Sequence, residues 1–359
     1  MRSRFLFPQI AKILWIRMLD LSNHWMGGVM DFQAQKKVVL DHHAALDRAR
    51  PGEAREALER HCDPAMVWMG MHPWDEIVGL DRLAEEVWEP LHHAFGPLQR
   101  RPDIFFAGAA SAHGRPGDWV CEMGHLLGLF DQPFLGIQPT RKMAFLRYAE
   151  FSRVQDGRIV EQALYFDLGF LMVQADVSPW ASTTGAMVLT PGPRMHDGLL
   201  LEACPPKDGA ATLALIERMI ARLVSKGVRT TMEDLGHDWR ADMLWWGPSG
   251  IGASYTHGRY IEQHCAPFEA GLEFVRHDGH ETRIAEGNFG GFFGYPSLVM
   301  KPTGGYMSNT TAGDISFEMR IVDIYRREGD LLAENWIFID HLHVLSQLGN
   351  DPLRRLQGG

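Results

Sequence analysis

The feature that most constrains the fold is an internal repeat. The segment MVWMG at 66–70 returns as MLWWG at 243–247. Further matches follow in the same order: Pro90 with Pro267, Pro139 with Pro302, Glu161 with Glu334, Asp167 with Asp340 and Gln174 with Gln347. The offset drifts by a few residues while the order is kept, as in two copies of one domain after loop insertions and deletions. The chain is therefore predicted to fold as two similar units.

The domain boundaries follow from length and from proline and glycine. A chain of 359 residues is comfortable for two domains. The stretch 178–208 is rich in proline and glycine, which indicates a linker between a first domain at 30–177 and a second at 209–352. Residues 1–29 carry charges within their apolar run and lack a cleavage site typical of export. We interpret them as an N-terminal extension, with Met30 as an alternative start.

Both copies show the same order of elements. Helical patterns occupy 51–62 and 80–91 in the first copy, and 210–226 and 257–265 in the second. Strand-like runs follow at 103–112, 118–130, 142–154 and 159–167, and then at 272–277, 281–289, 314–326 and 331–340. Helices followed by a series of antiparallel strands indicate an α+β class. A curved sheet wrapped around helices would enclose an interior cavity.

Composition excludes several functions. The formal net charge is −10, which disfavours nucleic acid as a partner. No uninterrupted apolar run is long enough for a membrane span. The four cysteines are scattered, so we expect a reducing cytoplasm. Neither a dinucleotide-binding nor a phosphate-binding glycine motif occurs, and no metal-ligand set is evident, so no cofactor and no metal are predicted.

The ends of the two copies carry a resemblance. The segment REGDLLAENWIFIDHLHVLSQLG at 327–349 resembles the closing segment of SnoaL-like polyketide cyclases, with Glu334, Trp336 and Asp340 at the family's positions. The segment QDGRIVEQALYFDLGFLMVQAD at 155–176 fits more loosely, because Ala163 replaces the tryptophan. The segment GHLLGLFDQPFLGIQPT at 124–140 is similar to the family's Gly-x-His and Pro-Thr stretch. The resemblance covers most of both halves.

The resemblance implies a fold and a set of catalytic residues. It implies two cone-shaped α+β barrels of the nuclear transport factor 2-like superfamily, packed as an internal pseudo-dimer; whether the tandem chain also forms a homo-oligomer stays open. In the cyclases, an aspartate at a strand end is the acid/base. By that match Asp167 and Asp340 become candidate catalytic residues, and His125 becomes a pocket histidine. A carboxyl group in an apolar pocket has a raised pKa and can move protons near neutral pH.

Aromatic and polar residues near these positions are candidates for substrate binding. Trp68, Trp245 and Trp246 lie on matching strands, and His72 with Trp74 would flank the pocket mouth. The complete set of substrate-binding candidates is Trp68, His72, Trp74, Arg147, Trp245, Trp246, Asn288 and Trp336. Core packing is the alternative for the aromatic residues, and an ion pair is the alternative for Arg147.

These observations predict a cofactor-free acid/base enzyme acting on a small hydrophobic carbonyl compound, by cyclisation, isomerisation or dehydration. A non-catalytic small-molecule-binding or scaffolding module of the same fold is the first alternative. Epoxide or ester hydrolysis is the second, and it requires an Asp–Arg or Asp–Asn relay in the pocket.

Overall fold

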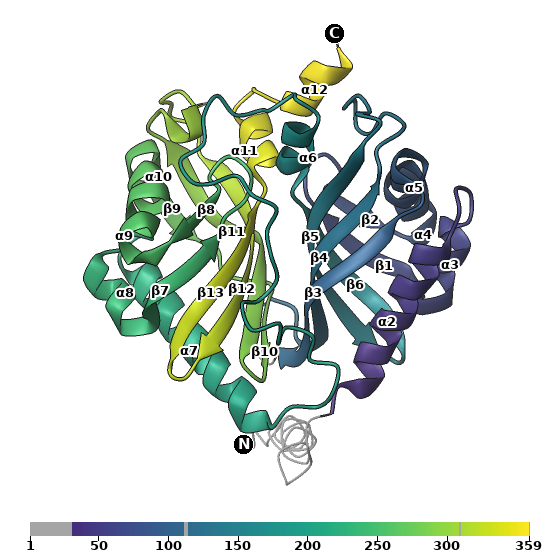
Figure 1. Cartoon of the computed structure of the whole chain (residues 1–359), viewed down its shortest axis with the longest axis horizontal. Coiled ribbons are helices and arrows are strands. Elements are labelled where there is room, and N and C mark those ends of the chain that lie inside the picture. Colours follow the sequence, from purple (N-terminus) through teal and green to yellow (C-terminus); the bar gives the residue numbers. More distant parts are fainter. Residues whose placement is uncertain (1–30, 111–113, 309, 359) are drawn as a thin grey trace, which may run out of the picture.

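Two curved sheets stand face to face, with helices on their outer sides (Figure 1). The computed structural model describes residues 31–110, 114–308 and 310–358. The predicted extension 1–29 lies outside the described residues. The prediction of an α+β chain with two curved, helix-wrapped sheets is confirmed. The predicted domain boundaries stay a prediction.

The first half begins with helices and ends with a short helix after its last strand. Its helices are α2 (Gln33–Arg48), α3 (Ala54–His61), α4 (Leu80–Leu83), α5 (Glu89–Phe95) and α6 (Leu168–Gln174), with a π-helical turn η1 (Ala84–Trp88) between α4 and α5. Its strands are β1 (Cys62–Gly70), β2 (Glu76–Val78), β3 (Gln99–Ala110), β4 (Gly117–Leu129), β5 (Met143–Gln155) and β6 (Arg158–Phe166). The sheet order is β2-β1-β6-β5-β4-β3, and β1 runs parallel to β6.

The second half repeats this plan. Its helices are α7 (Pro206–Ser225), α8 (Met232–Asp238), α9 (Thr256–Tyr260), α10 (Ala266–Gly271), α11 (His341–Gln347) and α12 (Pro352–Gln357), with a π-helical turn η2 (Ile261–Cys265). Its strands are β7 (Trp239–Trp246), β8 (Ala253–Tyr255), β9 (Leu272–His277), β10 (Thr282–Glu286), β11 (Phe289–Pro302), β12 (Phe317–Glu328) and β13 (Leu331–Ile339). The order is β10-β11-β12-β13-β7-β8, with β9 paired to β11 and β13 parallel to β7.

The two sheets bury one face against each other. A single apolar cluster joins side chains from both halves, and Phe293 of β11 contacts the rings of Trp119 and Phe151 at centroid distances of 5.5 and 5.4 Å. The opposite face of each sheet packs against the helices of its own half. Both faces of each sheet are therefore buried, and each strand presents one set of side chains to the interface and the other to the interior of its cone.

A buried ion pair also joins the halves. The Lys36 ammonium of α2 lies 2.7 Å from Glu286 of β10, and it donates to the carbonyl oxygen of Leu200. The other oxygen of the Glu286 carboxylate accepts the backbone N–H of Ala107 on β3. Buried charges are tolerated only when they are paired and hydrogen-bonded in this way.

The segment between α6 and α7 packs along both halves. Leu199 forms a bridge with Phe105 of the first sheet, and Ala186 forms one with Ala253 of the second. The indole N–H of Trp180 donates to the Ser249 hydroxyl at 2.7 Å. Helix α7 begins at Pro206, inside the stretch predicted as linker.

One long strand is absent from the sequence prediction. Strand β11 covers Phe289–Pro302, where the prediction had only the end of a run at 281–289. Its glycines and Pro296 weaken the strand pattern, because these residues are depleted in strands. The neighbours β10, β12 and β9 supply the pairing that overrides this local preference.

Candidate functional site

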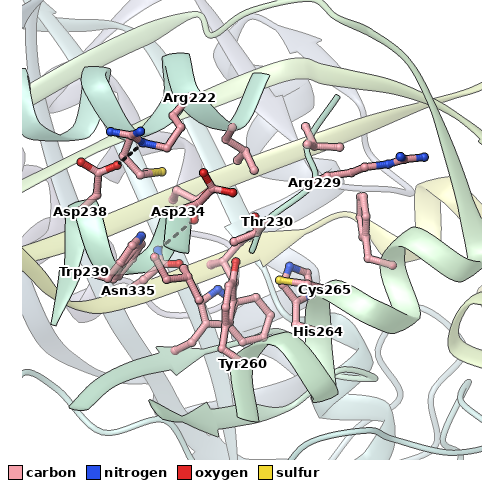
Figure 2. A pocket seen from close by; sticks show the side chains of 18 of the residues that line it. Arg222, Arg229, Thr230, Asp234, Asp238, Trp239, Tyr260, His264, Cys265 and Asn335 are labelled. Carbon is pink, nitrogen blue, oxygen red and sulfur yellow. Dashed lines mark hydrogen bonds and ion pairs between the residues drawn. The ribbon is translucent and has the colours of Figure 1, made fainter. Parts of the chain in front are cut away.

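The second cone contains a cavity of about 130 Å³ between its helices and its sheet (Figure 2). This is close to the roughly 150 Å³ that holds one benzene molecule in an apolar protein cavity. Its walls come from α7, α8, α9, η2, α10, β7, β11, β12 and β13. Most of the lining is apolar, including Met219, Leu235, Trp239, Phe268, Leu298, Ile321, Ile337 and Ile339. The cavity therefore suits a small, largely apolar ligand.

A carboxyl group lies among these apolar side chains. Asp323 of β12 alternates with Val322 and Ile324, which face the other sheet, and so it points into the cone. The side-chain amide of Asn335 on the adjacent β13 donates to its Oδ1 at 2.9 Å, and the Tyr325 hydroxyl also hydrogen-bonds to it. Burial outweighs both bonds and raises the pKa of Asp323 to about 7. Near neutral pH this carboxyl group can accept or donate a proton.

Two phenols lie near the carboxyl group, and a thiol lies next to one of them, Tyr260. Burial raises the pKa of Tyr260 and the pKa of Tyr325 well above their usual range, so both hydroxyls stay protonated. Figure 2 shows Tyr260, Asn335 and Cys265 around the same space. Burial raises the pKa of the Cys265 thiol to about 12, which makes it a poor nucleophile. The Tyr325 hydroxyl is bonded to Asp323, so the Tyr260 hydroxyl, which hydrogen-bonds to the Cys265 thiol, is the one suited to donate to an oxygen that gains negative charge.

The rim of the cavity is charged. The Arg222 side chain donates to the Asp238 carboxylate at 3.0 Å, as the dashed line in Figure 2 shows. Asp234 closes a capping box with Thr231 at the start of α8. The Arg222–Asp238 pair joins α7 to the end of α8 beside the cavity.

The matching positions of the first cone are occupied differently. Glu150 matches Asp323, and in place of an open space the His43 imidazole of α2 lies 2.9 Å from the Glu150 carboxylate. His43 also lies 3.3 Å from Glu122, which pairs with Arg100 at 3.2 Å. Burial and Arg100 oppose the charge on His43, but the two glutamates prevail and raise the pKa of His43 to about 9. Ion pairs therefore occupy the position beside Glu150 in the first cone.

The structure places the predicted aspartates elsewhere. Asp167 and Asp340 are the N-cap residues of α6 and α11, accepting from the N–H of Phe170 and of His343 respectively. The second oxygen of each accepts a backbone N–H from the other half: Ser249 for Asp167 at 2.9 Å and His72 for Asp340 at 2.8 Å. The two halves thus make equivalent hydrogen bonds to each other: each aspartate accepts one backbone N–H from the half to which it does not belong.

Asp167 and Asp340 share one hollow of about 10 Å³ between the halves, space for a single water molecule at most. Burial raises the pKa of Asp340 to about 6 and raises the pKa of Asp167, although Arg320 and Arg147 oppose the shifts. Neither residue lines the cavity of the second cone. Their predicted catalytic role stays a prediction, and their visible role is to cap helices and join the halves.

His125 and Arg147 lie on the interface face of their strands. His125 Nδ1 is 3.3 Å from Asp103, and its ring packs edge-on against Phe145. Arg147 donates to the carbonyl oxygens of Trp246 and Gly247 in the second half. His125 is therefore not brought near the cavity, and Arg147 contacts the other half rather than a ligand site.

The tryptophan candidates lie in different environments. Trp245 lines the cavity, whereas its neighbour Trp246 faces the other sheet. Trp68 and Trp74 pack against each other in the core of the first half, 6.0 Å between ring centroids. Trp336 lies in the interface cluster and donates to the Pro191 carbonyl oxygen.

The last two candidates lie away from the cavity. Asn288 sits before β11 and donates to Asp197, so it does not occupy the position of His125. The His72 side chain pairs with Asp351 at 3.0 Å.

Sequence reasoning missed Asp323, Asn335, Tyr260 and His264 as site residues. One signal was available: Asp323 is a lone carboxylate within the apolar run IVDIY at 321–325. Within the part of the chain that the structure describes, no group of three or more His, Cys, Asp or Glu side chains is arranged to hold a metal ion. In those same residues, no helix combines the length and the apolar character that crossing a membrane requires.

Comparisons with known proteins find similar folds. No family model and no curated protein matches the chain. Among solved structures, a protein proposed to be a SnoaL-like polyketide cyclase from Jannaschia sp. CCS1 is 20% identical, with a TM-score of 0.32, and the match covers 43% of this chain and 96% of that one. An NTF2-like protein from Burkholderia thailandensis is 24% identical with a TM-score of 0.30, covering 39% and 95%.

Proposed function

We propose that the chain is a cofactor-free acid/base enzyme whose active site is the cavity of the second cone. The observation that supports this most is Asp323, a carboxyl group held in an apolar cavity with a pKa of about 7 beside protonated hydroxyl groups. The substrate class is a small, largely apolar carbonyl compound. The reaction class is cyclisation, isomerisation or dehydration, each of which begins by removing a proton next to a carbonyl group.

The groups present can carry out such a step. The Asp323 carboxylate takes the proton from the carbon next to the carbonyl group, and the electron pair moves to the carbonyl oxygen. The Tyr260 hydroxyl donates a hydrogen bond to that oxygen while its negative charge develops. In isomerisation the protonated Asp323 then returns the proton to another carbon, and in dehydration it gives the proton to the leaving oxygen. In cyclisation the enolate carbon forms a bond to a second carbonyl carbon of the substrate, and the oxygen of that carbonyl group takes the proton. Positioned acid/base groups of this kind contribute roughly 10²–10⁴ in rate.

A second candidate function is hydrolysis of an epoxide or ester, and the Asp323–Asn335 hydrogen bond favours it. In that reaction Asp323 removes a proton from a water molecule that Asn335 orients. The water oxygen forms a bond to carbon, and a tyrosine hydroxyl protonates the departing oxygen. The first candidate is preferred because the cavity is mostly apolar, whereas a water-activating site needs several polar groups around the water.

The test is exchange of the methyl protons of para-fluoroacetophenone in heavy water, followed by NMR. We expect the wild-type protein to catalyse exchange at a rate that rises with pH through about 7, as Asp323 ionises. Asp323→Asn should lower the rate by roughly 10²–10⁴. Asp167→Asn and Asp340→Asn, which keep a capping side chain, should not lower it. If either capping variant stays folded but loses proton exchange, the active site lies at the interface instead. If the wild-type protein binds the ketone without exchanging its protons, the non-catalytic binding module is favoured.

A further inference from the structure

One polar side chain of the cavity has no role in the step described above. His264 belongs to the π-helical turn η2 and lines the cavity. The matching position of the first half is Val87, which is buried in the core of that half. Turns of this type are frequent at functional sites, because the extra residue redirects a side chain. The imidazole is thus specific to the half that has the open cavity.

The ring of His264 is held in place by aromatic neighbours. It stacks on Trp245 with 4.3 Å between centroids and 22° between planes. Tyr260 and Phe268 contact it at centroid distances of 5.3 and 5.7 Å. Burial lowers the pKa of His264 to about 3, so the ring is neutral at pH 7 and carries one donor nitrogen and one acceptor nitrogen.

The Nδ1 atom of His264 is shielded from solvent and has no hydrogen-bond partner among the described residues. An unpaired buried nitrogen is unfavourable, and most such groups in proteins find a partner. Figure 2 shows the His264 ring reaching toward the space between Tyr260 and Thr230. The shielding puts Nδ1 out of a ligand's reach, so a ligand in the cavity would bond to the other ring nitrogen, Nε2, which is not shielded in this way.

We propose that His264 binds the reacting oxygen of the substrate, and that the cavity takes an uncharged single-ring compound whose carbonyl oxygen meets this imidazole while its α carbon faces Asp323. The size of the ring follows from the cavity volume of about 130 Å³. The absence of charge on the ligand follows from the neutral imidazole and the apolar walls. The assignment of the α carbon rests on the proposed function, whereas the binding of the oxygen by His264 does not.

The experiment compares two ligands of nearly the same shape by fluorine NMR: para-fluoroacetophenone, which has a carbonyl oxygen, and para-fluoro-α-methylstyrene, which has a methylene group instead. One hydrogen bond corresponds to a preference of roughly two- to tenfold for the ketone in the wild-type protein. His264→Phe keeps an aromatic ring against Trp245 and should remove this preference. The matched control is His257→Phe, a buried histidine seven positions earlier that does not line the cavity, and it should keep the preference.

A second measurement avoids substitution altogether. In protein labelled with nitrogen-15 histidine, the ketone should shift the His264 ring nitrogens and the alkene should not. The proposal is overturned if the ketone preference survives in His264→Phe, if the ring nitrogens do not respond, or if neither ligand binds the wild-type protein. Failure of the proposed function gives a different result. In that case Asp323→Asn leaves proton exchange unchanged, while the wild-type protein still prefers the ketone to the alkene because of His264.

Discussion

At the scale of single residues, the environment of Asp323 separates it from the other carboxylates considered. Asp167, Asp340 and Asp323 are all buried, and burial raises the pKa of each. Only Asp323 borders a cavity large enough for a ring compound. Both oxygens of Asp167 and of Asp340 accept backbone N–H groups, so each carboxylate is held by hydrogen bonds within the protein. A raised pKa alone does not identify a catalytic group; free space beside it is also needed.

The raised pKa of Asp323 implies a stability cost. The unfolded carboxyl group has a pKa near 3.9, so between about pH 4 and pH 7 the folded state binds more protons and loses stability as pH rises. Asp323→Asn removes this penalty. Urea unfolding should show the variant more stable than wild type by on the order of 4 kcal/mol at pH 8, and nearly equal at pH 4. A variant that is less stable at both pH values would contradict the assigned environment.

Part of the site could be predicted from sequence, and part could not. The repeat placed Trp245 on a strand matching that of Trp68, and Trp245 does line the cavity. His125, Arg147 and Trp336 were assigned to a pocket, but they lie on the opposite face of their strands. When both faces of a sheet are buried, apolar and polar residues no longer alternate, and the pattern does not tell which face borders the cavity.

At the scale of elements, the two cones differ in the side chains that their first long helix, α2 or α7, packs against the inner face of the sheet. In the first cone, α2 brings His43 against Glu150 and Glu122, and in the second cone α7 brings Met219 and leaves space beside Asp323. The repeat predicted the shared strands, but His43 was not among the predicted site residues, so its effect on the first cone could not be anticipated. The second half therefore has a cavity beside Asp323, whereas ion pairs lie at the matching position of the first half.

The ion pairs of the first cone predict a pH-dependent stability. The pKa of His43 is raised from about 6.5 in the unfolded chain to about 9, so its contribution is complete below about pH 6.5 and is lost as pH rises through 9. His43→Gln should cost on the order of 3 kcal/mol at about pH 6, and the difference from wild type should shrink at about pH 9.5. Urea unfolding at both pH values measures this. An equal cost at the two pH values would mean that His43 is neutral in the folded protein.

At the scale of the whole molecule, the interface has both apolar and polar parts. The apolar cluster holds the sheets together, and Lys36–Glu286 and the exchanged caps of Asp167 and Asp340 fix their register. The residues that the sequence resemblance marked as catalytic belong to this interface. In a chain of two fused halves, a repeated polar residue can be kept for the contact between the halves.

The exchanged caps can be tested by truncation. Asp340→Ala removes the cap of α11 and leaves the His72 N–H without its partner, so we expect a cost of about 2–4 kcal/mol in the free energy of unfolding. Proton exchange by the folded variant should equal that of wild type. Asp351→Ala is a suitable comparison, because it caps the peripheral α12 and does not join the sheets, and its cost should be near 1 kcal/mol. A stable Asp340→Ala protein without exchange would support the catalytic role instead.

The most direct test of the central claim is a crystal structure of the protein with para-fluoroacetophenone. The account predicts density for one ligand in the second cone, with its carbonyl oxygen within hydrogen-bonding distance of His264 and its methyl carbon facing Asp323, and no ligand in the first cone. Density beside Glu150 in the first cone, or in an enlarged hollow at Asp167 and Asp340, would contradict the assignment of the active site to the second half.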